Sequence, residues 1–164
     1  MDLKELYQEI ILDHGKNPRN KKICNGFNKD AKGHNPLCGD KVHIYLKTDQ
    51  NKKVEDISFE GEGCAISIAS ASILTEIIKG KEHTLAKKIL EDFLKMLKDG
   101  SKFQLNSLEE NEKISMMSLS GVKKFPMRVK CASLAWHTFI HALEEKKTKV
   151  NTDTDNLQKE SENS

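Results

Sequence analysis

The chain has 164 residues, of which 37% are hydrophobic and 32% are charged, and its formal net charge is +2. This length and balance predict one soluble domain with a real core. The small net charge argues against a nucleic-acid partner, and no apolar run approaches the roughly 20 residues that a membrane helix needs. The acidic, amphipathic N-terminus is unlike a secretory signal, so we expect a cytoplasmic protein with reduced thiols and no membrane partner.

The first predicted element is a helix that begins after Asp2. Asp2 can cap it, with Glu5 as the capping-box partner, and Gly15 and Pro18 are expected to end it. Residues 19–40 are rich in Asn, Gly and Lys, which predicts a loop with room for one short strand.

Two strands follow. Residues 41–48 and 54–63 alternate apolar with polar side chains, a pattern typical of half-buried strands, and the polar turn between them predicts a hairpin.

Helices occupy the rest of the ordered chain. A buried helix is expected from Cys64 to Lys79, and Thr84 can cap a third helix that ends at Gly100. Residues 101–124 predict a long connection with one short helix, and Pro126 suits the first turn of a final helix that runs to about residue 145.

This order of elements predicts an α+β domain, with a small antiparallel sheet and helices packed on one side of it. The domain is assigned to residues 1–148. Residues 149–164 are polar and lack aromatic side chains, which predicts a disordered C-terminal tail.

The four cysteines are Cys24, Cys38, Cys64 and Cys131. In a cytoplasmic chain they favour metal binding or sulfur chemistry over disulfides. No pair has the CxxC spacing of a zinc knuckle, so any metal ligands must come from distant segments.

Three of these thiols have settings that suit a metal site. Cys38 precedes Gly39 and Asp40 in a turn, so the thiol and the carboxylate can face one point. Cys64 and Cys131 lie near predicted helix N-termini, where the helix dipole favours thiolate. Three thiolates and one carboxylate would satisfy tetrahedral zinc.

Packing is the competing explanation for each thiol, because a single cysteine is usually a core residue. Cys24 is assigned to packing, and the residues alone leave Cys64 and Cys131 open between the two roles. His34 is a weaker candidate ligand, as are His137 and His141 at helical spacing. His14 is predicted to be a cation at the end of the first helix.

Four segments together resemble the U-type iron–sulfur cluster assembly proteins, the SufU/IscU/NifU N-terminal-like family. They are HGKNPRN (14–20), NPLCGD (35–40), FEGEGCAISIASASILTEIIKGK (59–81) and LSGVKKFPMRVKCASLAW (119–136). The resemblance spans about residues 5–145 and is to the SufU branch, because Lys130 stands where IscU-type scaffolds carry a histidine. The extra segment at 101–122 also resembles that branch.

The resemblance implies an α+β fold with a three-stranded antiparallel sheet. It implies that Cys38, Asp40, Cys64 and Cys131 surround one metal site, with zinc as the cofactor. It further implies that Cys38 accepts persulfide sulfur from a SufS-type cysteine desulfurase for downstream cluster assembly proteins. From its chemistry, Arg128 is expected to support the site by hydrogen bonding to Asp40 or a thiolate.

Three functions therefore compete. The first is a zinc-dependent sulfurtransferase, and the second is a scaffold on which an iron–sulfur cluster is assembled and transferred, since thiolates suit both metal sites. The third is a zinc-stabilised adaptor without chemistry. Metal analysis with a visible spectrum separates the first two, and a sulfur-transfer assay separates the first from the third.

Overall fold

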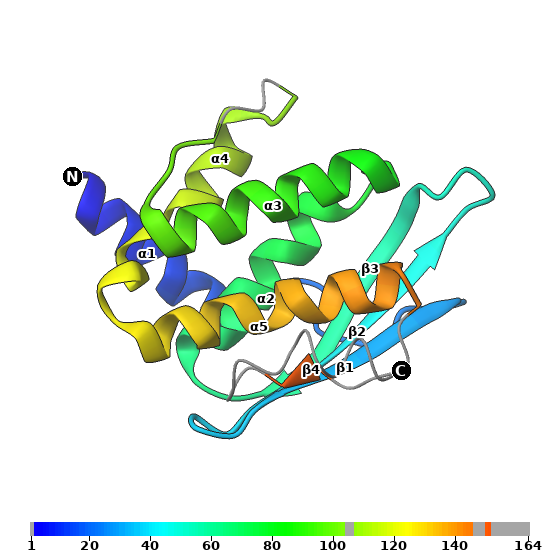
Figure 1. The fold of residues 1–164 in the computed structure, drawn as a ribbon, viewed down its shortest axis with the longest axis horizontal. Helices are drawn as coiled ribbons and strands as arrows, with labels where there is room; N and C mark the ends of the chain where they lie inside the picture. Colours follow the sequence, from blue (N-terminus) through cyan, green and yellow to red (C-terminus); the bar gives the residue numbers. More distant parts are fainter. Residues whose placement is uncertain (1, 104–106, 146–149, 152–164) are drawn as a thin grey trace.

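The structure is a computed structural model that describes residues 2–103, 107–145 and 150–151 (Figure 1). Its elements, in chain order, are α1 (Leu3–Lys16), β1 (Lys29–Asn35), β2 (Asp40–Thr48), β3 (Val54–Glu62), α2 (Ala65–Ile78), α3 (His83–Asp99), α4 (Glu110–Met117), η1 (Ser120–Lys124), α5 (Pro126–Leu143) and β4 (Val150–Asn151).

The sheet has four strands in the order β3-β2-β1-β4. The first three are antiparallel neighbours, whereas β4 runs parallel to β1, pairing Val150 with Gly33 and Asn151 with His34. The α+β class is confirmed, but the prediction of a three-stranded, purely antiparallel sheet was wrong. The fourth strand comes from the predicted disordered tail, whose other residues, 149 and 152–164, lie outside the described part of the chain.

The helices lie over one face of the sheet (Figure 1). The helix α5 packs on β1 and β2, α2 packs on β3 and α5, and α1 and α3 pack on α2 and α5 respectively. Trp136 anchors this layer: its ring stacks on Phe93 at a centroid distance of 4.0 Å, and its Nε1 donates to Ser70 Oγ at 3.0 Å. None of the described helices is long and apolar enough to cross a membrane.

The helix boundaries differ from the sequence prediction in three places. The helix α1 continues through Gly15 and ends just before Asn17 and Pro18. The helix α3 starts at His83, so Thr84 lies in its first turn and does not cap it. The connection predicted to hold one short helix contains two helical segments, α4 and η1.

Candidate metal centre

The turn between β1 and β2 presents the first candidate ligand. Asn35 and Asp40 form the last residue pair of the two strands, and the backbone N–H of Cys38 donates to the Asn35 carbonyl oxygen at 3.3 Å. Gly39 completes the turn with a φ of +72°, a left-handed conformation that glycine adopts without strain. The turn therefore holds the half-buried Cys38 two residues from Asp40.

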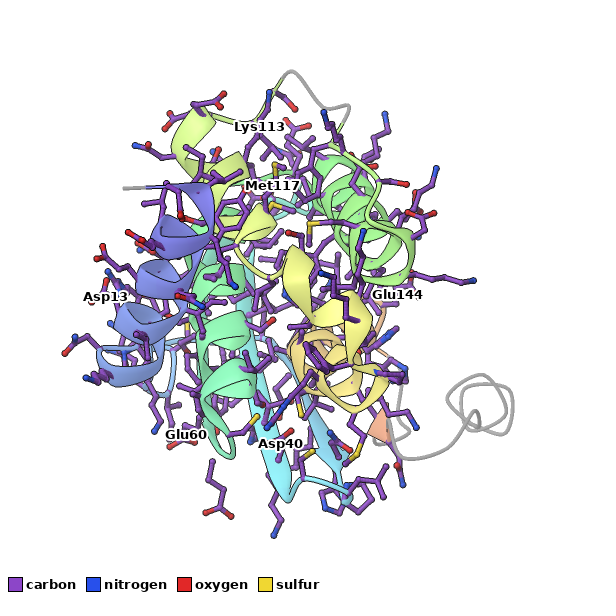
Figure 2. All side chains as sticks on the ribbon, turned by 90° about the vertical axis from the view of Figure 1, so that its left-hand side faces the viewer. Asp13, Asp40, Glu60, Lys113, Met117 and Glu144 are labelled. Atoms are coloured by element: carbon purple, nitrogen blue, oxygen red, sulfur yellow. The ribbon has the colours of Figure 1, made fainter. Side chains whose placement is uncertain are left out.

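Asp40 connects this turn to the start of α2. Its side chain has no exposed surface, and its Oδ1 accepts the backbone N–H of Cys64 at 2.9 Å. Gly63 makes this approach possible, since a Cβ on Gly63 would lie 2.3 Å from Asp40 Oδ1. Figure 2 shows Asp40 at one end of the sheet, with sulfur atoms around it.

Cys64 is the N-cap residue of α2. Its Sγ accepts the backbone N–H of Ser67 at 3.5 Å, so the thiol sulfur is held at the helix start. The side chain is half-buried, which leaves part of it accessible at the edge of the site.

The third thiol, Cys131, is buried in α5, and it completes a compact group. The ligand atoms of Cys38, Asp40 and Cys131 all lie within 4.8 Å of one another. Cys64 lies outside this group of three, but it is near enough to contribute to raising the pKa of the Cys131 thiol, and its N–H donates to Asp40. All four residues in the predicted site are therefore neighbours, with three of them in one tight group.

The surroundings of Cys131 explain its electrostatics. Burial raises the pKa of the Cys131 thiol well above its usual range, and hydrogen bonds with Cys38 and Asp40 raise it further. Three neighbouring thiols and a carboxylate, of which Asp40 and Cys131 are buried, disfavour negative charge unless a cation is present. This donor set fits zinc, which takes sulfur and oxygen ligands in tetrahedral sites.

Asn35 is a part of this site that sequence reasoning missed. Its side chain is fully buried, and its Nδ2 donates to Asp40 Oδ2 at 3.2 Å and to Cys131 Sγ at 3.6 Å. Its Oδ1 has no hydrogen-bond partner among the described residues. Leaving a buried acceptor unpaired costs about 1–3 kcal/mol. The sequence feature that could have pointed to Asn35 is its position at the start of the NPLCGD segment.

Arg128 has an exposed side chain on the first turns of α5. It lines a groove of about 710 Å³ with Tyr7 of α1, residues of η1 and Phe125, which follows η1. Among the described residues, the donors to Asp40 include Asn35 and Cys64, and Arg128 is not one of them. The alternative support of a thiolate by Arg128 stays a prediction.

The weaker candidate ligands lie elsewhere. His34 is a half-buried residue of β1, and burial, followed by the neighbouring His141, lowers the pKa of His137 to about 4. Among the described residues, no group of three potential ligands includes these histidines. Cys24 is buried near the far end of the sheet, where its thiol donates to Asp56 at 3.4 Å, as expected of a packing residue.

Residues 6–132 match the family described as the NifU-like N terminal domain. The chain belongs to this family. The match contains the candidate ligands and all of the elements from β1 to η1.

Two curated members of the wider family are similar over most of their length. A zinc-dependent sulfurtransferase SufU from Bacillus subtilis is 42% identical over 138 residues, covering 82% of this chain and 87% of the relative. An iron–sulfur cluster assembly scaffold protein IscU from Streptococcus pyogenes is 36% identical over 141 residues, covering 86% and 84%.

The fold agrees with a solved structure. A Fervidobacterium islandicum protein, named as a candidate iron–sulfur cluster assembly scaffold for the SUF system, superposes with a TM-score of 0.72 at 35% identity. The superposition covers 85% of this chain and 97% of that protein.

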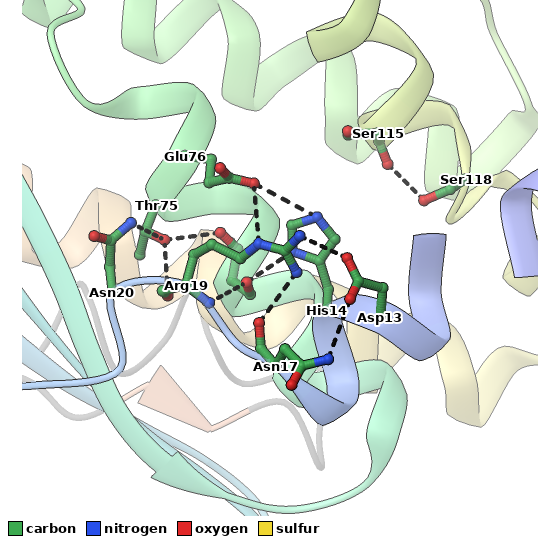
Figure 3. Close-up of polar contacts among 10 residues, drawn as sticks. Asp13, His14, Asn17, Arg19, Asn20, Thr75, Glu76, Ser115 and Ser118 are labelled. Carbon is green, nitrogen blue, oxygen red and sulfur yellow. Dashed lines mark hydrogen bonds and ion pairs between the residues drawn. The ribbon is translucent and has the colours of Figure 1, made fainter. Parts of the chain in front are cut away.

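In this NifU-like domain, residues of the HGKNPRN segment (14–20) link the end of α1 to α2 through polar contacts (Figure 3). His14 Nδ1 lies 2.7 Å from Ser72 Oγ, which also accepts the backbone N–H of Arg19 at 2.8 Å. His14 Nε2 lies 3.5 Å from Glu76 Oε1. Burial, followed by the positive charge of Arg19, lowers the pKa of His14 to about 4. The prediction of a cationic helix cap was wrong: His14 is a buried, neutral link between two helices.

Proposed function

We propose that this protein is a zinc-dependent sulfurtransferase that accepts persulfide sulfur from a SufS-type cysteine desulfurase and passes it to iron–sulfur cluster assembly. The observation that carries the proposal is the convergence of Cys38, Asp40 and Cys131 within 4.8 Å, beside Cys64. The similarity to the zinc-dependent sulfurtransferase SufU of Bacillus subtilis supports the same function.

The candidate zinc ligands are Cys38, Asp40, Cys64 and Cys131. When bound, zinc would keep the ligand thiols deprotonated and would connect the β1–β2 turn to two helices. Cys64 caps α2 and Cys131 lies in α5, so we assign them to anchoring, and Asp40 is held through both carboxylate oxygens.

Cys38 is the proposed sulfur acceptor. It is in a turn rather than a helix, it is half-buried, and the adjoining Gly39 has nothing within 4 Å of the position of a Cβ. The Cys38 thiolate would attack the outer sulfur of the persulfide on the desulfurase. One sulfur–sulfur bond forms at Cys38 while the partner's sulfur–sulfur bond breaks and its cysteine leaves as a thiolate. The transfer needs no external oxidant or reductant.

The direct test is persulfide loading from a SufS-type desulfurase and cysteine, followed by mass spectrometry of the protein. Cys38→Ala should accept no sulfur. Cys24→Ala is the matched control, because Cys24 is buried away from the candidate site and should leave loading unchanged. Normal loading of Cys38→Ala would show that another thiol is the acceptor. No loading of the wild type would contradict the sulfurtransferase function and favour the zinc-stabilised adaptor without chemistry.

The scaffold role is the second candidate function. Three thiols around one carboxylate also suit an iron–sulfur cluster, and the likeness to the Streptococcus pyogenes IscU favours this alternative. Anaerobic purification separates the two: one zinc per chain and no visible absorption support the sulfurtransferase, whereas a cluster chromophore with iron and sulfide supports the scaffold.

A further inference from the structure

We propose that Asn35 is the positioning residue of the metal centre, and that its single side-chain amide sets the geometry of Asp40 and Cys131. The inference rests on the proposed function for the identity of the metal. It concerns a residue that is not one of the four candidate ligands.

Asn35 connects the candidate ligands to one another. Asn35 contacts three of the four candidate ligands: its carbonyl oxygen accepts the Cys38 N–H, and its Nδ2 donates to Asp40 and to Cys131. The fourth, Cys64, is joined to the same set because its N–H donates to Asp40. Asn35 therefore connects the turn to α5.

The charge of the centre also favours a neutral amide at position 35. The centre combines three thiols with one carboxylate, and the donors to Asp40 include the Asn35 amide and the Cys64 backbone N–H. An amide donates two hydrogen bonds without adding a charge that would repel a cation. Its orientation is determined by its neighbours, because exchanging Oδ1 and Nδ2 would put the amide oxygen against a carboxylate oxygen and a sulfur atom.

Asn35 is poorly suited to a purely structural role. The side chain is fully buried, yet Oδ1 has no partner within the described residues. An apolar residue of similar size would avoid that unpaired acceptor. The amide is thus explained by what its Nδ2 holds, namely one oxygen and one sulfur ligand.

The experiment compares Asn35→Ala and Asn35→Asp with wild type and with Asn28→Ala. Asn28 hydrogen-bonds with Thr48 beside the other end of the β1–β2 pair, so its variant controls for a weakened hairpin. Zinc affinity is measured by competition with a chromophoric chelator, and cobalt is used as a spectroscopic probe. We expect both Asn35 variants to bind zinc about 10- to 100-fold more weakly and to shift the cobalt absorption bands. Asn28→Ala should change neither.

A metal-free readout keeps the inference separate from the proposed function. In protein stripped of metal, the alkylation rate of Cys131 should differ in Asn35→Ala from that in wild type and Asn28→Ala, because Asn35 Nδ2 donates to the Cys131 sulfur and its side chain is buried beside it. If the wild type binds no zinc but this alkylation difference holds, the proposed function fails and the positioning role stands. If both Asn35 variants match wild type in zinc affinity, cobalt spectrum and alkylation, the inference is overturned.

Discussion

Gly63→Ala tests how the turn carrying Cys38 is held to α2. Gly63 has a φ of +152°, and a Cβ there would lie 2.3 Å from Asp40 Oδ1 and 3.0 Å from Asp40 Cα. Alanine would therefore be strained in its own backbone and would push Asp40 away from the Cys64 N–H. The variant removes one specific contact between the hairpin and the helix.

The expected loss of stability follows from these two effects. Backbone strain of this kind costs about 1–3 kcal/mol. Breaking the hydrogen bond to the Asp40 carboxylate costs about 1.5–3 kcal/mol more. For a chain of this size, 1 kcal/mol corresponds to about 2–4 °C in melting temperature, so we expect a decrease of about 5–20 °C.

The assay is thermal unfolding in the presence of a chelator, so that metal binding does not contribute. Gly39→Ala is the matched control, because Gly39 also has a positive φ but has nothing within 4 Å of a Cβ. Its left-handed backbone alone should cost about 1–2 kcal/mol. If Gly63→Ala melts within 2 °C, roughly 1 kcal/mol, of Gly39→Ala, the proposed link between Asp40 and α2 is refuted.

Three further predictions concern the rest of the molecule. Removal of zinc should lower the melting temperature clearly, because the metal would connect distant segments of the fold. An unchanged melting curve after confirmed removal would show that the metal does not stabilise the fold. Val150→Ala deletes two buried methyl groups next to β1 and should lower stability by about 1.5 kcal/mol, measured by urea unfolding, whereas an unchanged midpoint would contradict the packing of β4. The pKa of His14 is lowered to about 4, so its stabilising effect is present above pH 6.5 and is lost as the pH falls towards 4. His14→Asn should therefore reduce the loss of stability between pH 7 and pH 5 by about 2 kcal/mol, and an unaltered pH profile would exclude this role.

The elements with strong periodicity were predictable from the sequence. Ile89, Phe93, Met96 and Leu97 are at helical spacing and are all buried in α3, and the strands of the predicted hairpin are β2 and β3. In each case one face of the element meets the core, so the sequence pattern and the burial pattern agree.

The strand β1 was predicted only as room for one short strand within residues 19–40, and β4 was not predicted. The strand β1 contains Gly33, where a Cβ would lie 2.1 Å from Thr138 Oγ1 of α5, so glycine is required by the close approach of the helix. Such a residue weakens the apparent preference for a strand. The two residues of β4 are too few to produce a pattern, and their pairing depends on where α5 returns the chain.

The candidate site shows the same limit at the level of single side chains. The residue types and their positions near turns and helix starts favoured Cys38 and Asp40 as ligands but left Cys64 and Cys131 open, and the family resemblance completed the candidate set of four. Asn35 carries no such chemical signal, and its role depends on its pairing opposite Asp40 across β1 and β2 and on its contact with α5. Candidate ligands can thus be named from residue type and family resemblance, whereas the residue proposed to orient them becomes visible only when strand register and helix packing are known.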